Sequence, residues 1–539
     1  MTNSRRRTAA LIAVCAIAAV LHLGPYIIAT IATPDGWTFT GNTHGSPDNM
    51  VYRTWMRQSM ETGFFVTNKF TEEPNPPHIP VGEFWIFGKI AQVTGVRSET
   101  VYEIGGSVLA AVLTWLVWLV LAKFGRSRIE KLWMFAIIAV SGGVASHMKL
   151  VQAATSVPGT RVLASLVERP LETTSFLEDF RGTYFLKTIL DTHFIVVWTM
   201  VLMSLLAAHA TMRKPRNMSS WAAMLVLFGL TTLVSIYQGV SIIAVMAAVC
   251  LVFRIRGHDW RHWLRVLLAS LCVVGGVAMW QVFKWKAAGL PLPEWRGPYL
   301  LFAVVVVGYP FVFLTAPMGA AHFVKNADMD DSFIAGWAAG LLAIVLSSPF
   351  YLYPVRGTVT LAIPLAIIAC RVYFRNHRQV SFAHAAVAIV LMIALPVHIA
   401  YTWRRDLEFR PDRTYIWINQ NHKDVIRYLR EHADESDLLL VDRRRAPWQT
   451  DDRWLAPAFR GRMYSGNYFL TPNYSAKRGG VIQFYHQMES VTRATFLEQS
   501  KIRWVFAGPE NDLPTLRNTP GLVLRLSFPE GSLLEYIGS

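Results

Sequence analysis

Residues 220–253 read SWAAMLVLFGLTTLVSIYQGVSIIAVMAAVCLVF and contain no charged residue and no histidine. A helix that crosses a membrane needs about 20 mostly apolar residues. The run is therefore long enough for nearly two crossings. Tyr237-Gln238-Gly239 interrupts it near the middle and predicts a tight external turn between a span over 220–236 and a span over 238–253. This stretch indicates a helical membrane protein.

The same criterion applied to the rest of the chain predicts further spans, which bring the total to about eleven. The additional spans are 9–32, 101–123, 131–147, 187–210, 264–284, 298–315, 332–349, 357–373 and 381–402. The first follows Arg5-Arg6-Arg7 as in a signal peptide, but its apolar stretch is longer than a signal core. We therefore expect it to be retained.

Composition supports the membrane assignment. Charged residues make up 16% of the chain and hydrophobic residues 53%, whereas soluble proteins contain about 25% charged residues. An ordinary soluble enzyme, a disordered chain, a collagen and a small disulfide scaffold are all excluded on these figures. The four cysteines lie inside apolar runs, where none is placed to form a disulfide in an exposed domain.

The net charge of +16 raises the question of a nucleic-acid surface, but the basic residues cluster in short loops between apolar runs. Loops rich in Lys and Arg remain in the cytoplasm. With a cytoplasmic N-terminus, alternate loops carry these clusters: Lys123/Arg126/Arg128/Lys131, Arg213/Lys214/Arg216, Arg254/Arg256/Arg261/Arg265, Lys325 and Arg371/Arg375/Arg378. We therefore predict an inner-membrane protein with no nucleic-acid partner and an extracytoplasmic C-terminus.

This topology defines two domains. Residues 1–410 form the transmembrane domain, with external loops at about 33–100 and 148–186, and residues 411–539 form an extracytoplasmic α/β domain. In the second domain we expect helices near 421–432 and 492–500. We also expect strands at 438–441 and 502–506, and a hairpin at 521–537 that turns at Pro529-Glu530-Gly531-Ser532.

The first external loop contains the most informative polar residues. Beyond Asp48 and Asn49, the apolar residues Tyr52, Trp55, Met56 and Met60 recur at helical spacing, which predicts a helix along the membrane surface. Asp48 stands at the start of this helix. It is either part of a helix cap together with Ser46 and Pro47, or a general base whose partly desolvated carboxylate removes a proton from an acceptor.

An N-terminal membrane helix followed by a loop with Asp48, Asn49 and Tyr52 and by an interfacial helix resembles the GT-C class of integral-membrane glycosyltransferases. The segments 68–74 and 349–357 and the α/β tail also resemble bacterial members of this class. The resemblance implies transfer of a sugar from a polyprenyl-phosphate donor to a glycan, lipid or protein acceptor on the extracytoplasmic face, with inversion and with Asp48 as the base. Asn49 replaces the second acid common in the class, which disfavours a divalent metal, so no cofactor is required.

The remaining candidate residues have roles taken from the resemblance or from their position. Glu172 and Asp179 in the second external loop are candidates for a second catalytic acid, beside a purely solvated loop as the alternative. Seven residues are candidates for substrate binding: Asn49, Tyr52, Arg53, Arg181, His193, Gln238 and Arg356. Arg356 is the best candidate for the donor phosphate because it is basic on the external side, although interfacial anchoring explains it equally well.

Two other functions remain open at this point. A transporter or lipid flippase predicts ionisable residues near the bilayer midplane and repeated halves, and the centres of these spans carry almost no charge. A non-catalytic envelope scaffold is the other alternative. Phosphate-binding glycine loops, the HExxH motif and the nucleophile elbow are missing from the sequence, which gives no support to ATP-driven transport or to hydrolase chemistry.

Overall fold

The computed structural model describes residues 3–43, 47–140, 188–189, 191–287, 328–346, 360–376, 416–442, 452–467, 470–509, 511 and 513–538. The chain folds into two compact units. Unit 1 comprises residues 1–24, 103–280 and 295–405, and unit 2 comprises residues 25–102, 281–294 and 406–539. The predicted division at residue 410 assigned the first external loop to the transmembrane domain; here the loop and the tail belong to one unit.

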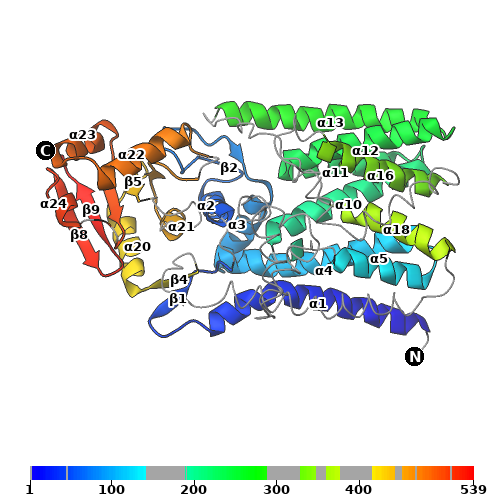
Figure 1. Cartoon of the computed structure of the whole chain (residues 1–539), viewed down its shortest axis with the longest axis horizontal. Helices are drawn as coiled ribbons and strands as arrows, with labels where there is room; N and C mark the ends of the chain where they lie inside the picture. The colour runs from blue at the N-terminus through cyan, green and yellow to red at the C-terminus, as the bar shows by residue number, and fades with distance from the viewer. Residues whose placement is uncertain are drawn as a thin grey trace, which may run out of the picture. The chain divides into compact units, whose positions relative to one another are not determined.

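Unit 1 is a bundle of apolar helices (Figure 1). The helices that lie wholly or mostly in it are α1 (Asn3–Ile31), α4 (Ser98–Phe124), α5 (Arg128–Val140), α10 (Thr192–Arg213), α11 (Met218–Val234), α12 (Ile236–Ile255), α13 (Trp260–Ala287), α16 (Met329–Leu346) and α18 (Ala362–Asn376). Within the described ranges, six helices are long and apolar enough to cross a membrane, namely α1, α4, α10, α12, α13 and α16. Met218–Val234 and Ala362–Arg371 are shorter apolar helices.

These helices confirm a multi-pass helical membrane protein. Each predicted span that falls on described residues overlaps one of them, whereas 298–315 and 381–402 lie outside the described residues. The total of eleven spans therefore remains a prediction. The turn expected at Tyr237-Gln238-Gly239 falls slightly earlier: α11 ends at Val234 and Ser235 separates it from α12.

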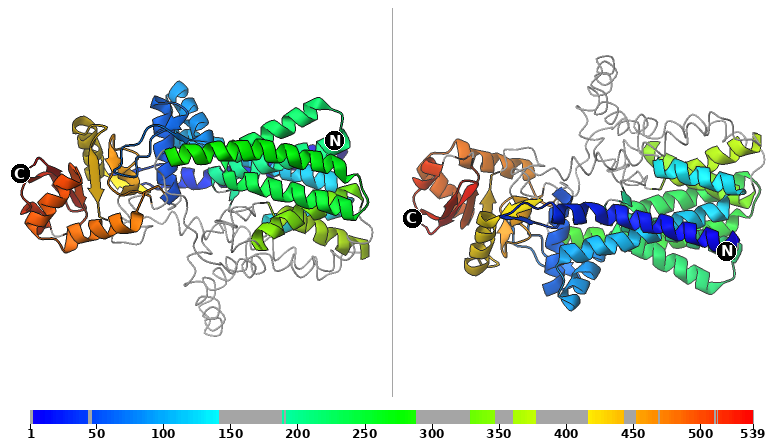
Figure 2. Two further views of the ribbon diagram at one scale, coloured as in Figure 1. Left: turned by 90° about the horizontal axis from the view of Figure 1, so that it is seen from above. Right: turned by 90° about the horizontal axis from the view of Figure 1, so that it is seen from below.

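Packing between the helices of unit 1 is close enough to require glycine. A Cβ atom added to Gly336 would lie 2.5 Å from Val249 Cα, and one added to Gly340 would lie 2.5 Å from Val245 Cα. Small residues four positions apart let two membrane helices approach closely, which explains how α16 lies against α12. Elsewhere α1 runs alongside α4 (Figure 2), where Ser107 Oγ donates to the carbonyl oxygen of Ala19 at 2.9 Å.

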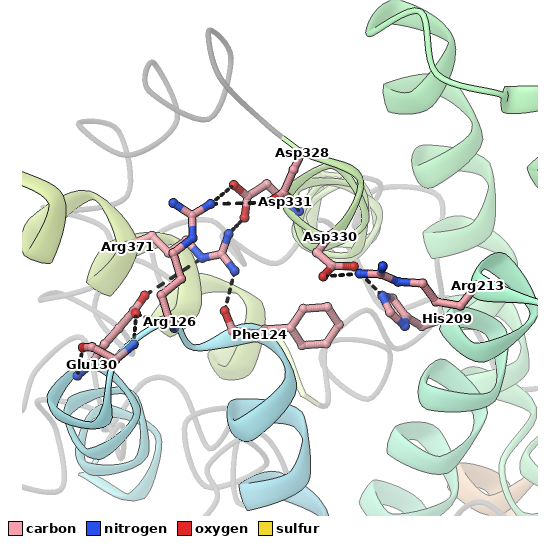
Figure 3. Close-up of polar contacts among 10 residues, drawn as sticks. Phe124, Arg126, Glu130, His209, Arg213, Asp328, Asp330, Asp331 and Arg371 are labelled. Carbon is pink, nitrogen blue, oxygen red and sulfur yellow. Dashed lines mark hydrogen bonds and ion pairs between the residues drawn. The ribbon is translucent and has the colours of Figure 1, made fainter.

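A polar network joins one end of these helices (Figure 3). Its members come from α5, α10, α16, α18 and the adjoining turns: Arg126, Glu130, His209, Arg213, Asp328, Asp330, Asp331 and Arg371. Glu130 also forms a capping box with Ser127, whose Oγ accepts from the Glu130 N–H at 3.1 Å while Glu130 Oε2 accepts from the Ser127 N–H at 3.2 Å. The network thus ties together helix ends that are far apart in the sequence.

Unit 2 begins with the end of α1 and the segment that follows it. This segment contains β1 (Trp37–Phe39), α2 (Pro47–Glu61), β2 (Phe65–Val66), β3 (Ile79–Pro80) and α3 (Gly82–Thr94). Helices α2 and α3 cross at Gly88, where a Cβ atom would lie 2.6 Å from the carbonyl oxygen of Met56. The helix predicted from Met50 onward is confirmed as α2, and its start at Pro47 places Asp48 inside the first turn.

The tail of unit 2 is an α/β fold. Its sheet has the order β6-β5-β7-β9-β8, in which β5 (Leu438–Val441) is parallel to β6 (Arg462–Met463) and β7 (Trp504–Ala507). The hairpin β8 (Leu522–Phe528) and β9 (Gly531–Tyr536) completes it through antiparallel pairing of β9 with β7. Outside this sheet, β4 (Trp417–Asn419) pairs antiparallel with β1.

Helices cover both faces of the tail sheet. Val505 and Ala507 belong to one hydrophobic cluster with side chains of α22 (Tyr474–His486) and α23 (Ser490–Gln499). The alternate residues of β7 contact the other helices: Trp504 meets Tyr428 of α20 (Gln420–His432), and Phe506 meets Trp454 of α21 (Asp452–Leu455). The short helix α24 (Leu513–Arg517) precedes β8. The predicted helices, strands and hairpin of the tail are confirmed, and α22 and α3 were not predicted.

Candidate active site

The described part of the loop ahead of α2, up to residue 43, follows a tight path. Gly36 and Gly41 have φ angles of +79° and +87°, a region that favours glycine. A Cβ atom at Gly41 would lie 2.6 Å from Glu99 Cβ, so no other residue fits there. The loop residues Thr40, Asn42 and Thr43 are buried. The loop is thus pressed against the start of α4 before it reaches α2.

Asp48 lies half-buried in the first turn of α2, one residue after Pro47. A carboxylate in this position interacts favourably with the unpaired N–H groups of the helix start. Its neighbour Asn49 donates from Nδ2 to Asn42 Oδ1 at 2.9 Å. The cap position itself, at Ser46, lies outside the described residues. The Asn49–Asn42 hydrogen bond therefore links the start of α2, where Asp48 lies, to the tightly turned part of the loop.

Arg53, a predicted substrate-binding residue, contacts protein groups on the next turn of α2. Its Nη2 donates to the carbonyl oxygen of Thr40 at 2.6 Å and to Glu99 Oε1 at 2.8 Å. Arg97 also donates to Thr40 O, at 3.2 Å, and its Nε lies 3.8 Å from Glu99 Oε2. These contacts hold the loop, the start of α4 and the first half of α2 together.

Tyr52 is buried in an aromatic cluster. Its ring stacks on Phe84 of α3 with a centroid distance of 4.5 Å, and Trp55 and Tyr102 contact the same Phe84 ring at 5.6 Å and 6.2 Å. The cluster fixes the orientation of α2 about its own axis. The orientation of α2 in turn determines the direction in which Asp48 leaves the helix.

The other predicted site residues are distributed differently. His193 lies half-buried in the first turn of α10, where Asp191 is the N-cap and its Oδ1 accepts from the His193 N–H at 3.1 Å. Gln238 is buried in the first turn of α12. Both belong to unit 1. Glu172, Asp179, Arg181 and Arg356 lie outside the described residues.

The residues that contact the loop before α2 were not identified from the sequence. Arg97 and Glu99 lie just before the second predicted span, and their charge at that boundary is the signal that could have identified them. Thr40 acts through its backbone carbonyl, for which the sequence gives no signal.

An ionisable pair inside the helices of unit 1 was also missed. His22 Nε2 lies 3.3 Å from Glu103 Oε2 and 3.2 Å from Thr192 Oγ1. Its Nδ1–H donates to the carbonyl oxygen of Ile189 at 2.6 Å. A Cβ atom at Gly106 would lie 2.3 Å from His22 Nε2, so this glycine makes room for the ring. The pair joins α1, α4 and the start of α10.

Among the residues that the structure describes, no three His, Cys, Asp or Glu side chains form a group suited to a metal ion. The printed contacts of the loop and the first half of α2 join amides, guanidinium groups and backbone carbonyls, together with the arginine-paired Glu99. Asp48 is a half-buried carboxylate at a helix start, and a general base needs a carboxylate within hydrogen-bond reach of the proton that it removes.

Comparison with protein-family models and with curated proteins gives no match. Solved structures do match. The mycobacterial arabinofuranosyltransferase AftD superposes with a TM-score of 0.58 and 15% identity over 100% of this chain and 40% of AftD. The oligosaccharyltransferase of Archaeoglobus fulgidus in its apo form superposes with a TM-score of 0.57 and 12% identity over 93% of this chain and 70% of that one.

The chain has the GT-C fold. It spans about two fifths of the length of AftD, and at these identities the likeness concerns the fold. ArnT from Cupriavidus metallidurans, solved with undecaprenyl phosphate, aligns over 99% of this chain with a TM-score of 0.48 and 11% identity. In the GT-C fold of this chain the first helix is followed by a loop and helix α2 carrying Asp48, in the order that the sequence resemblance predicted.

Proposed function

We propose that this protein is a membrane glycosyltransferase that moves a sugar from a polyprenyl-phosphate-linked donor to a glycan, lipid or protein acceptor on the extracytoplasmic face of the inner membrane. The observation that carries the proposal is the GT-C fold together with a half-buried carboxylate, Asp48, in the first turn of α2. Two of the solved proteins that match this fold are an arabinofuranosyltransferase and an oligosaccharyltransferase.

The proposed reaction uses Asp48 as general base. The acceptor oxygen forms a bond to the anomeric carbon of the sugar while its proton passes to the Asp48 carboxylate. The bond between the anomeric carbon and the phosphate oxygen breaks on the opposite face, so the configuration inverts. Polyprenyl phosphate leaves as an anion and needs no acid to protonate it, which is why one carboxylate suffices.

Roles for the other predicted residues are part of this proposal. Arg356 would bind the donor phosphate through its planar guanidinium, and Arg181, His193 and Gln238 remain candidates for substrate binding. Glu172 and Asp179 are the alternatives for a second acid, while Asn49 would orient the acceptor near Asp48. The structure gives Arg53 and Tyr52 supporting contacts, so we assign them to the shape of α2 rather than to substrate.

Replacement of Asp48 by Asn tests the proposal. The change keeps the size of the side chain and removes the base, so we expect the rate of transfer to fall by about 10²- to 10⁴-fold. The assay uses the full-length protein in lipid nanodiscs with undecaprenyl-phosphate-linked hexose and pentose donors, and measures the undecaprenyl phosphate released. Asp35→Asn is the matched control because Asp35 is exposed in the same loop.

The outcomes are distinct. A collapse of turnover in Asp48→Asn, with wild-type turnover in Asp35→Asn and an unchanged unfolding temperature, supports the base. Near-normal transfer by Asp48→Asn moves the search to Glu172, Asp179 and Asp191. No transfer by the wild type with any donor contradicts the proposed activity.

A further inference from the structure

The segment Asn68–Asn75 of the first loop forms a closed turn of its own. The Asn68 N–H donates to Asn75 Oδ1 at 2.6 Å, and Asn75 Nδ2 donates back to the carbonyl oxygen of Asn68 at 3.0 Å. Asn75 Nδ2 also donates to the carbonyl oxygen of Glu73 at 3.0 Å. The turn thus has a fixed shape before any contact with the tail is considered.

Backbone groups of the tail bind this turn. The N–H of Met463 donates to the carbonyl oxygen of Lys69 at 2.8 Å, and the N–H of Gly466 donates to that of Phe70 at 2.9 Å. Phe70 is fully buried, and a Cβ atom at Gly466 would lie 2.5 Å from Phe70 Cβ. Thr471 Oγ1 donates to Phe70 O at 2.6 Å. The turn therefore packs closely against the tail segment that includes β6 and the residues directly after it.

A buried lysine closes the contact. Lys477 of α22 places Nζ 3.0 Å from Glu72 Oε1, 2.5 Å from Glu73 Oε1 and 3.2 Å from Thr71 Oγ1. The Lys477 side chain is only 8% exposed, whereas Glu72 and Glu73 are 27% and 45% exposed, so solvent screens these ion pairs only in part. The ring of Tyr464 lies 5.9 Å from Nζ and adds a cation–π contact. We name Lys477, Glu72 and Glu73 the clasp.

The clasp is connected to α2 by short steps. Gln58 of α2 accepts from the N–H and the hydroxyl of Thr67 at 3.1 Å and 2.8 Å, and Thr67 directly precedes the turn. Arg57 of α2 donates to the carbonyl oxygen of Pro457 in the tail at 2.8 Å. At the other end, β1 pairs with β4 just ahead of the loop that leads to Asp48. The tail thus holds the chain both before and after the segment with Asp48.

We propose that the C-terminal α/β domain is a positioning domain for the active site, and that Lys477 is its central positioning residue. The clasp fixes the turn, the turn fixes the second half of α2 through Gln58, and a rigid helix then fixes the carboxylate of Asp48. The inference rests on the proposed function for its catalytic consequence. A displacement of about 1 Å at a reacting group is enough to cost about 10²-fold in rate.

The test compares Lys477→Met, Lys477→Arg and the control Lys501→Met in the full-length protein in nanodiscs. Lys501 is exposed, and in the described part of the chain it forms no ion pair. Two quantities are measured: hydrogen exchange in the peptide covering 47–61, and kcat and KM with an undecaprenyl-phosphate-linked sugar as donor.

We expect Lys477→Met to speed exchange in α2 several-fold and to lower kcat by about 10- to 100-fold with a smaller change in KM. Lys477→Arg should recover most of both, because it retains the charge, and Lys501→Met should match the wild type. If Lys477→Met does not fold, Glu73→Gln replaces it, since Glu73 is 45% exposed and its loss is milder.

The two hypotheses fail in different ways. A wild type that transfers no sugar contradicts the proposed function, and the exchange measurement then decides the inference alone. Unchanged exchange in α2 of Lys477→Met or Glu73→Gln overturns the positioning role, whatever the activity. Faster exchange with an unchanged kcat also overturns it, because α2 would then move without consequence for the reaction.

Discussion

The guanidinium of Arg53 has two protein partners, and their energetics distinguish a supporting role from a substrate-binding one. The side chains of Arg53 and Glu99 are 14% and 17% exposed, so solvent screens their ion pair only in part. We expect Arg53→Met and Glu99→Gln to show a coupling energy of about 0.5–3 kcal/mol in a double-mutant cycle of unfolding. A coupling energy near zero, together with a raised KM for the donor in Arg53→Lys, would indicate that Arg53 binds substrate.

His422 makes the stability of the tail depend on pH. Burial is the main cause that lowers its pKa to about 4 from the usual 6.5, against the opposing effect of Glu530. Its Nδ1–H donates to Asn419 Oδ1, and its ring meets Trp454 edge to face at 4.7 Å. Between pH 6.5 and 4 the unfolded chain binds a proton that the folded chain does not, so stability falls as the pH falls.

The expected loss between pH 7 and pH 4 is about 3 kcal/mol at most. It is measured as a fall in the hydrogen-exchange protection factors of the peptide covering α20, each observed rate being divided into the intrinsic exchange rate at the same pH. His422→Gln should remove most of the pH dependence, whereas the exposed His432, replaced by Gln, should leave it in place. Equal pH dependence in both variants would show that another group is responsible.

At the scale of elements, α12 and α16 depend on two glycines for their close packing. Gly336→Ala or Gly340→Ala places a methyl group against the backbone of α12, and we expect each to cost about 1–3 kcal/mol. Gly276→Ala on α13 meets nothing within 4 Å and should be neutral or slightly stabilising, because alanine favours a helix. Thermal unfolding in detergent measures all three. An unchanged unfolding temperature in Gly340→Ala would mean that α12 and α16 can move apart to admit the methyl group at little energetic cost.

The elements differ in how well the sequence predicts them. Uncharged apolar runs predict membrane helices because burying charge in lipid is costly, and the described parts of the predicted spans are helical. In α22 the buried positions Lys477, Val481 and Phe484 follow a helical spacing, but a lysine begins the series and Gly479-Gly480 interrupts it. The lysine is buried because it pairs with Glu72 and Glu73. These two residues lie about 400 residues earlier in the chain, so a local sequence pattern cannot reveal the pairing.

The site follows the same rule. Asp48 and the helix that carries it are local features, and sequence reasoning found them. The partner of Arg53 is Glu99, and Arg57 donates to the carbonyl oxygen of Pro457. These contacts depend on the folded loop and tail, so they could not be derived from spacing. Sequence patterns thus predict a candidate residue and its helix, whereas the contacts that hold this helix become visible only in the structure.

At the scale of the whole molecule, the polar network of unit 1 bears on topology (Figure 3). Arg126 lies 3.1 Å from Asp331, Arg213 lies 2.6 Å from Asp330, and Arg371 pairs with Asp331. These residues belong to four loops or helix ends that the distribution of basic residues assigns to the cytoplasm. Their contacts gather these helix ends at one end of unit 1, as the predicted topology expects of loops on the same side of the membrane.

We therefore expect a reporter fused after Ser539 to be extracytoplasmic and one fused after Lys214, beside the network, to be cytoplasmic. Alkaline phosphatase should be active only in the first fusion, and green fluorescent protein should fluoresce only in the second. The physical reason is the retention of basic loops on the cytoplasmic side, combined with an odd number of spans in the whole chain. Fluorescence after Ser539 would require an even number. It would also place the tail and Asp48, which share unit 2, on the side of the membrane opposite to the one on which the proposed transfer takes place.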